Sequence, residues 1–167
     1  MADGPPVRRR AMLRFGLVTA LIVLVLDQIL KLAVLDLLDG GARAIVVTPF
    51  FNLVLVWNRG VSFGMLQGLG AILPWALAAV ALAVIVGLVV WLSRTGQRPV
   101  AFGLGLVIGG ALGNVVDRAR YGAVADFLDF HLAGYHWPAF NLADAAICVG
   151  AVILIADGLL APRRQYT

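Results

Sequence analysis

Four segments of this chain are apolar over about 20 residues each, which is the length that a helix needs to cross a lipid bilayer. They are residues 12–35, 72–92, 99–118 and 142–160. Hydrophobic residues make up 62% of the chain and charged residues only 13%, a balance far from that of soluble globular proteins. The sequence therefore predicts an α-helical integral membrane protein with four transmembrane helices, folded as a single membrane domain over residues 1–167.

The first apolar segment also looks like the start of a secretory signal peptide, because Arg8, Arg9 and Arg10 precede it. A signal peptide has a short apolar core followed by a cleavage site of small residues. No such site follows here, and the apolar run continues past Lys31 to Leu35. We therefore expect a first helix that is retained.

Basic residues mark one side of the membrane. Four spans place both termini on the same side, together with the short connection between the second and third segments. Eight of the thirteen basic residues fall on that side: Arg8, Arg9, Arg10, Arg14, Arg94, Arg98, Arg163 and Arg164. Since Lys and Arg concentrate in cytoplasmic loops, we expect both termini in the cytoplasm. The same placement argues against a nucleic-acid groove, so no nucleic acid is expected as a partner.

The two outer connections differ in character. Residues 36–71 contain the stretch 44–57, which is rich in β-branched and aromatic residues and is interrupted by Pro49. This composition predicts a small extracytoplasmic β-rich loop domain at the membrane surface. Residues 119–141 form a mixed outer loop, in which aromatic residues such as Tyr135 and Trp137 favour the bilayer interface.

Polar residues inside the predicted spans indicate where a site lies, because a charge in the membrane costs roughly 2.5–3.5 kcal/mol. With the predicted orientation, three of the four helices bring such residues to the outer side: Asp27 and Lys31 on the first, Asn114, Asp117 and Arg118 on the third, and Asp144 on the fourth. A line of glycines at 105, 109 and 113 lets another helix approach the third one closely.

Local pairing is the alternative explanation for two of these sets. Asp27 and Lys31 have the i, i+4 spacing of an ion pair within one helix. Asp117 and Arg118 can also neutralise each other. Each set is therefore either a structural pair or part of a site.

Three acids have no obvious local partner: Asp126, Asp129 and Asp144. One of the first two can simply face water. Asp144 follows Asn141 at the spacing of a capping box, and an acid in the first turn suits the helix dipole. The residues alone therefore leave Asp144 as either a cap or a catalytic group.

The remaining signals are weaker. His131 and His136 flank a glycine-containing loop without the spacing of a metal site, so no metal is expected. The single cysteine, Cys148, cannot form a disulfide within the chain. Gly60, after Asn58 and Arg59, indicates a turn or a close backbone approach.

Five short motifs occur in order along the chain. They are Asp27-Gln28-x-x-Lys31, Asn58-Arg59-Gly60-x-x-Phe63, Gly109-Gly110-x-x-Gly113-Asn114-x-x-Asp117-Arg118, Val124-x-Asp126-Phe127 and Phe140-Asn141-x-Ala143-Asp144. Each is a weak pattern alone, but five in this order on a four-span chain are highly specific. Through them the sequence resembles the lipoprotein signal peptidases, also called signal peptidase II, over essentially its whole length.

The resemblance implies an aspartic peptidase of the bacterial inner membrane, active near the outer leaflet without a cofactor. Its substrates are prolipoproteins, cleaved just before a cysteine that carries a diacylglyceryl group. Asp126 and Asp144 match the catalytic positions, while Asp129 has no assigned counterpart. The resemblance also implies a substrate site lined by Asn58, Gly60, Asn114, Arg118 and Asn141, where globomycin-type inhibitors bind. Asp27, Lys31 and Asp117 are expected to be structural polar residues, and the protein is expected to be a monomer.

This chemistry fits the residues. Amide hydrolysis by two carboxylates needs one ionised group to activate water and one protonated group to donate, and two close acids share a proton naturally. Asp126 and Asp144 can meet if the outer loop between them folds back. The apolar stretch with Phe50, Phe51 and Trp57 is then placed to clamp a lipid-modified substrate from above.

The alternative function is a small ion- or proton-coupled transporter, since charges in membrane helices also mark ion pathways. A transporter predicts polar residues through the full membrane depth. Residues 72–92 contain no charge, and the inner parts of the first and third segments are apolar apart from terminal arginines. A structural scaffold would tolerate neutralisation of Asp126 or Asp144. We therefore favour the peptidase.

Overall fold

Four helices form the body of the protein in the computed structural model, which describes residues 6–38, 44–60 and 72–160. They are α1 (Pro6–Leu38), α2 (Leu73–Arg94), α3 (Arg98–Tyr121) and α4 (Leu142–Leu160). Each is long and apolar enough to cross a membrane. Large apolar side chains on their outward faces, such as Val80 and Val152, are exposed, as expected for surfaces that face lipid.

The predicted spans coincide with these helices, and the differences lie at their ends. α1 begins at Pro6 rather than near residue 12, and it continues to Leu38. Apolar length reports only the part of a helix inside hydrocarbon, whereas the helix continues through its basic flank. Pro99 lies in the first turn of α3, as predicted, where its missing N–H costs nothing. The tail residues Arg163 and Arg164, which supported the predicted orientation, lie outside the described residues.

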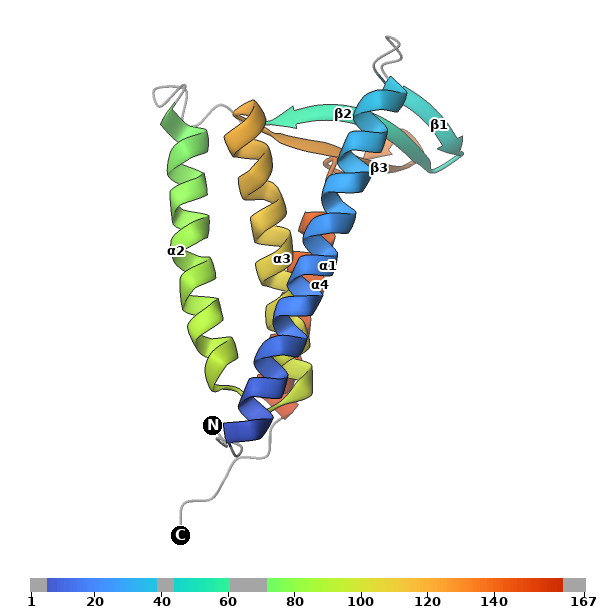
Figure 1. Cartoon of the computed structure of the whole chain (residues 1–167). Coiled ribbons are helices and arrows are strands. Elements are labelled where there is room, and N and C mark those ends of the chain that lie inside the picture. The colour runs from blue at the N-terminus through green and yellow to red at the C-terminus, as the bar shows by residue number, and fades with distance from the viewer. Residues whose placement is uncertain (1–5, 39–43, 61–71, 161–167) are drawn as a thin grey trace.

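A four-stranded antiparallel sheet lies across one end of the helices (Figure 1). Its strands follow the order β1 (Ala44–Thr48), β2 (Phe51–Asn58), β3 (Val124–Leu132) and β4 (Tyr135–His136). The strands predicted within 44–57 are confirmed, with the turn at Pro49. Figure 1 shows that α1 ends beside the sheet, whereas the start of α1 and the end of α4 lie at the opposite end of the bundle.

The second outer connection is more ordered than its mixed sequence indicated. We predicted a loop over 119–141, but α3 continues to Tyr121 and is closed by Gly122 in the left-handed conformation, at a φ of 67°. β3 then pairs with β2, which is more than 60 residues earlier in the chain. Asp126 therefore lies on a central strand of the sheet and not on a loop.

α3 is the central helix and contacts the other three. The predicted glycine line explains how closely α1 approaches it. A Cβ added at Gly105 would lie 2.6 Å from the carbonyl oxygen of Gly16, and one at Gly109 would lie 2.5 Å from that of Ala20. Neither position has space for a side chain, so the close approach predicted from the small residues is confirmed.

Candidate active site

Polar side chains from α1, α3, β3 and the start of α4 meet close to the sheet. Four of the residues predicted to share one level are buried, namely Asp27, Lys31, Asn114 and Asp117, and Asp126 and Asn141 are buried with them. Asp144 is partly buried beside them. The predicted convergence of α1, α3 and α4 is therefore present in the structure, and β3 contributes Asp126 to it.

An ion cluster forms the deeper part of this network. The Lys31 ammonium lies 2.8 Å from Asp27 Oδ2 and 2.8 Å from Asp117 Oδ2. Gln28 Nε2 donates to the same two carboxylates, at 3.2 Å and 3.0 Å. The predicted pair of Asp27 with Lys31 is confirmed. The ion pair of Asp117 is made with Lys31 on another helix and not with Arg118, although the charge of Asp117 also attracts the Arg118 guanidinium.

Two carboxylates, Asp126 and Asp144, form the second part of the network. Asn141 Nδ2 donates to Asp126 Oδ1 at 2.7 Å, and the Asn141 backbone N–H donates to Asp144 Oδ2 at 3.3 Å. Asn114 Nδ2 donates to Asp144 Oδ1 at 2.8 Å, while its Oδ1 accepts a hydrogen bond from Asn141 Nδ2 at 3.3 Å. Two buried amides thus link the two acids to each other.

Asn141 also begins α4 as its cap. Its side-chain oxygen accepts the Asp144 backbone N–H at 2.9 Å, and Asp144 returns a bond to the Asn141 backbone N–H. This reciprocal pair is the capping box that the spacing predicted. The cap fixes the direction of the Asp144 side chain, and so it does not exclude a second role for that acid.

Burial raises the pKa of the Asp126 carboxyl to about 6. Hydrogen bonds from Asn58 and Asn141 oppose this increase, and the nearby charge of Asp144 adds to it. Because two neighbouring carboxylates resist double ionisation, such a pair favours a state in which one of the two carries a proton. The arrangement suits a reaction that needs one acid and one base.

Asn58 joins the site from the end of β2. Its Nδ2 donates to Asp126 Oδ2 at 3.0 Å, and its Oδ1 accepts the backbone N–H of Gly60 at 2.8 Å. Gly60 has a φ of 85°, which confirms the predicted turn and is a conformation that favours glycine. The turn thus orients the amide that contacts Asp126. Phe63, the last residue of this motif, lies outside the described residues.

Arg118 lies at the edge of the network. Its Nη1 donates to the Asn114 backbone oxygen at 3.3 Å, and its buried Nε has no hydrogen-bond partner among the described residues. The guanidinium is attracted by the charges of Asp144, Asp117 and Asp126. It therefore has donor capacity beside the two linked acids.

Asp129 belongs to a separate cluster on the sheet. It is buried, so the prediction that one of Asp126 and Asp129 faces water is wrong. Asn52 Nδ2 donates to Asp129 at 2.9 Å, and His136 Nδ1 lies 2.8 Å from it. The hydrogen bond from His136 lowers the pKa of Asp129 below its usual value. Asn52 was not predicted to belong to a site. Its contact with Asp129 depends on the register between β2 and β3, which the sequence does not show.

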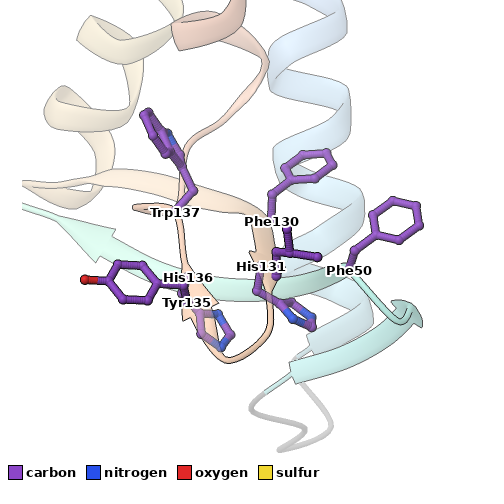
Figure 2. Close-up of a pocket in the computed structure, with 7 residues that line it drawn as sticks. Phe50, Phe130, His131, Tyr135, His136 and Trp137 are labelled. Atoms are coloured by element: carbon purple, nitrogen blue, oxygen red, sulfur yellow. The ribbon is translucent and has the colours of Figure 1, made fainter.

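The histidines lie beside a cavity of about 400 Å³ at the β3–β4 hairpin. Figure 2 shows His131 and His136 at the hairpin, with Phe50, Phe130, Tyr135 and Trp137 around them. The two imidazole rings stack with centroids 4.8 Å apart. Among the described residues, no three His, Cys, Asp or Glu side chains are placed to hold a metal ion.

Known proteins are similar to this chain in both sequence and fold. The family model described as signal peptidase (SPase) II matches residues 19–160. The lipoprotein signal peptidase of Burkholderia mallei (strain SAVP1) is 51% identical over 141 residues, which are 84% of each chain. That of Ralstonia nicotianae is 49% identical over 143 residues, covering 84% of this chain and 82% of the relative.

Two solved structures, each described as a bacterial membrane enzyme, superpose on this chain with a TM-score of 0.73. One is 25% identical and covers 92% of this chain and 93% of its own length, and the other is 27% identical and covers 89% and 94%. The family match extends from the middle of α1 to the end of α4, and both related proteins are named lipoprotein signal peptidase. The chain therefore belongs to the signal peptidase II family.

Proposed function

We propose that this chain is a membrane aspartic endopeptidase that cleaves signal peptides from bacterial prolipoproteins, on the N-terminal side of the diacylglyceryl-modified cysteine. Its family membership supports this reaction. We assign catalysis to Asp126 and Asp144, and the observation that carries the assignment is the Asn141 bridge. One residue binds Asp126 through its side chain and Asp144 through its backbone.

In the proposed mechanism Asp144 is the base and Asp126 is the acid. Asp144 lies in the first turn of α4, where the helix dipole favours a negative charge. Asp126 keeps its proton up to about pH 6, because burial raises its pKa. Asp144 takes a proton from water as the water oxygen bonds to the scissile carbonyl carbon, and Asp126 donates its proton to the carbonyl oxygen. The C–N bond then breaks as Asp144 gives its proton to the leaving nitrogen, and Asp126 takes a proton back from a hydroxyl of the tetrahedral intermediate.

The surrounding amides and Arg118 position the reactants. Asn114 and Asn141 hold the two acids, and Asn58 with Gly60 holds Asp126 from the side of β2. The Nε of Arg118 has no hydrogen-bond partner within the described part of the chain, and the charges of both acids attract the guanidinium. We propose that this guanidinium donates to a backbone carbonyl of the substrate, which fixes the peptide beside the dyad.

A transporter is not supported. The family match is to a peptidase. The charged groups of the network contact β3 and the start of α4, and the part of α2 inside the predicted span contains no charged residue. A charge pathway through the membrane would need polar groups along the whole length of the helices.

The site also has a proposed place in the cell. We propose that both termini are cytoplasmic and that the sheet and the dyad lie near the outer leaflet of the inner membrane, because basic residues flank the opposite ends of the helices. There the site meets the scissile bond of a membrane-anchored substrate. Globomycin-type inhibitors are proposed to occupy the same site, and the protein to act as a monomer.

The test is cleavage of a diacylglyceryl-modified prolipoprotein by purified protein in detergent. Asp126→Asn and Asp144→Asn keep the size of each side chain but remove the acid. Since acid–base catalysis contributes about 100-fold or more, each variant is expected to lose at least that factor in kcat. Parental cleavage by either variant would show that the dyad assignment is wrong.

Asp129→Asn is the matched control, because it removes a buried carboxylate from the same strand outside the network. We expect this variant to cleave the substrate at close to the parental rate per folded molecule. Addition of a chelator is expected to leave cleavage unchanged. Loss of activity with chelator would instead require a metal in the mechanism.

A further inference from the structure

Lys31 is buried at the centre of the ion cluster, with only 3% of its side chain exposed. Its ammonium group has three donors, and the structure provides three acceptors: Asp27 Oδ2, Asp117 Oδ2 and, at 3.2 Å, Asn114 Oδ1. A buried ammonium with every donor used joins α1 to α3 at one point. This arrangement costs desolvation energy, and an apolar contact of the same size would not.

The two carboxylates bound by Lys31 each hold a backbone amide of another element. Asp27 Oδ1 accepts the N–H of Ala143 at 3.0 Å, at the start of α4. Asp117 Oδ2 accepts the N–H of Ala125 at 3.1 Å, on β3. Ala143 directly precedes Asp144 in the chain, and Ala125 directly precedes Asp126. Each backbone bond therefore fixes the residue next to one acid of the proposed dyad.

The position of this ion cluster is not needed for stability alone. An ion pair between α1 and α3 would hold two helices together wherever it lay. Here the chain of contacts runs from Ala143 through Asp27, Lys31 and Asp117 to Ala125, and so it spans the distance between the two acid-bearing segments. Asn114 adds a direct branch, because it accepts from Lys31 and donates to Asp144.

We propose that Lys31 is a positioning residue of the peptidase: through Asp27 and Asp117 it sets the separation of the backbone segments that carry Asp126 and Asp144. The inference rests on the proposed function of those two acids. Lys31 does not touch substrate in this role. It determines whether both carboxylates reach the same water and the same peptide bond.

The charge of Lys31 gives the role a second consequence. The charged groups around the dyad are Asp27 and Lys31 from α1, Asp117 and Arg118 from α3, Asp126 from β3 and Asp144 from α4. Among these, the Lys31 ammonium favours the ionised form of Asp126 and so lowers its pKa. Removal of this charge therefore raises the pKa of Asp126, and Asp126 keeps its proton to a higher pH.

Two variants separate positioning from stability. Lys31→Met removes the charge and leaves two buried carboxylates without their cation, which is expected to lower the thermal stability. The double variant Lys31→Met with Asp117→Asn removes one of those carboxylates as well, and the amide that replaces it keeps an oxygen to accept the Ala125 N–H. We expect the double variant to regain much of the lost stability.

The kinetic expectation differs from the stability expectation. If Lys31 sets the dyad spacing, kcat falls by about 100-fold in both variants while KM changes little, because misplacement by about 1 Å has an effect of that size. The high-pH limb of kcat/KM moves upward in Lys31→Met and back toward the parental value in the double variant, where the local net charge is restored. Asp36→Asn, which removes a carboxylate from the same helix outside the ion cluster, is the control and keeps the parental kcat and pH limb.

The outcomes are distinguishable from failure of the proposed function. A double variant that is stable and has the parental kcat would show that Lys31 is structural only, provided that Asp126→Asn and Asp144→Asn are inactive in the same assay. Parental activity of either Asp→Asn variant would instead reject the dyad itself. If Lys31→Met does not fold, the double variant alone decides, since it removes one cation and one carboxylate and so keeps the local net charge of the parent.

Discussion

Asn141 shows how one residue can serve both the fold and the site. It is fully buried, and its side-chain oxygen caps α4 while its side-chain nitrogen donates to Asp126. The sequence left Asp144 as either a cap or a catalytic group. The structure confirms the capping box, and the proposed catalytic role uses the same geometry, because the cap directs the Asp144 carboxylate toward the other acid.

The pKa of Asp126 leads to a prediction at the residue scale. If the protonated Asp126 is the acid, kcat/KM falls as pH rises through about 6, where the free enzyme loses this proton. The hydrogen bond from Asn58 favours the ionised form, so Asn58→Ala raises the pKa of Asp126 and moves this limb to higher pH. The check is a pH profile of cleavage for both proteins. A downward shift in Asn58→Ala would contradict the assignment of the acid.

At the scale of elements, apolar length was enough to predict four helices, and β-branched residues were enough to predict strands within 44–57. β3 was missed because its first half is buried on both faces, so its sequence lacks the alternation that marks a half-exposed strand. The contact of Asp117 with Lys31 was missed for a related reason. Spacing along one helix identifies only partners on that helix, whereas this pair crosses between two helices.

The candidate site could also be predicted from the sequence only in part. The positions of the polar residues along the predicted spans were enough to predict that those of α1, α3 and α4 lie at one level of the membrane. They could not choose between Asp126 and Asp129, which lie three positions apart. The choice came from the family motif, and the structure then placed the two acids in different clusters. What sequence patterns could not supply was register across the sheet.

The glycine line on α3 gives a prediction about helix packing. Gly109→Ala places a Cβ against the backbone of α1, and overpacking of this kind costs about 1–3 kcal/mol of unfolding free energy. Gly87→Ala is the matched control, because a Cβ there meets no atom within 4 Å. Thermal unfolding in detergent is expected to show a lower midpoint for Gly109→Ala only. Equal midpoints would mean that α1 and α3 are not in close contact.

At the scale of the whole molecule, the sheet lies across one end of the bundle (Figure 1), and the buried polar network contacts its strand β3. A peptidase whose substrate is anchored in the membrane needs its site at the boundary between hydrocarbon and water. Burial of the ion cluster keeps its charged groups away from lipid, and of the two acids of the proposed dyad Asp144 is only partly buried. Stable folding in the membrane and the proposed reaction therefore both favour polar residues at this end of the bundle.

The orientation of the molecule can be tested by cysteine labelling. In a Cys148→Ala background, Tyr135→Cys places a thiol on the exposed β3–β4 hairpin, and Gln97→Cys places one on the exposed connection between α2 and α3. Basic residues flank the second position, so we expect it to be cytoplasmic. A membrane-impermeant maleimide added to intact spheroplasts is therefore expected to label Tyr135→Cys, and to label Gln97→Cys only after permeabilisation. The reverse pattern would place the dyad on the cytoplasmic side, where a signal peptide that has crossed the membrane does not present its cleavage site.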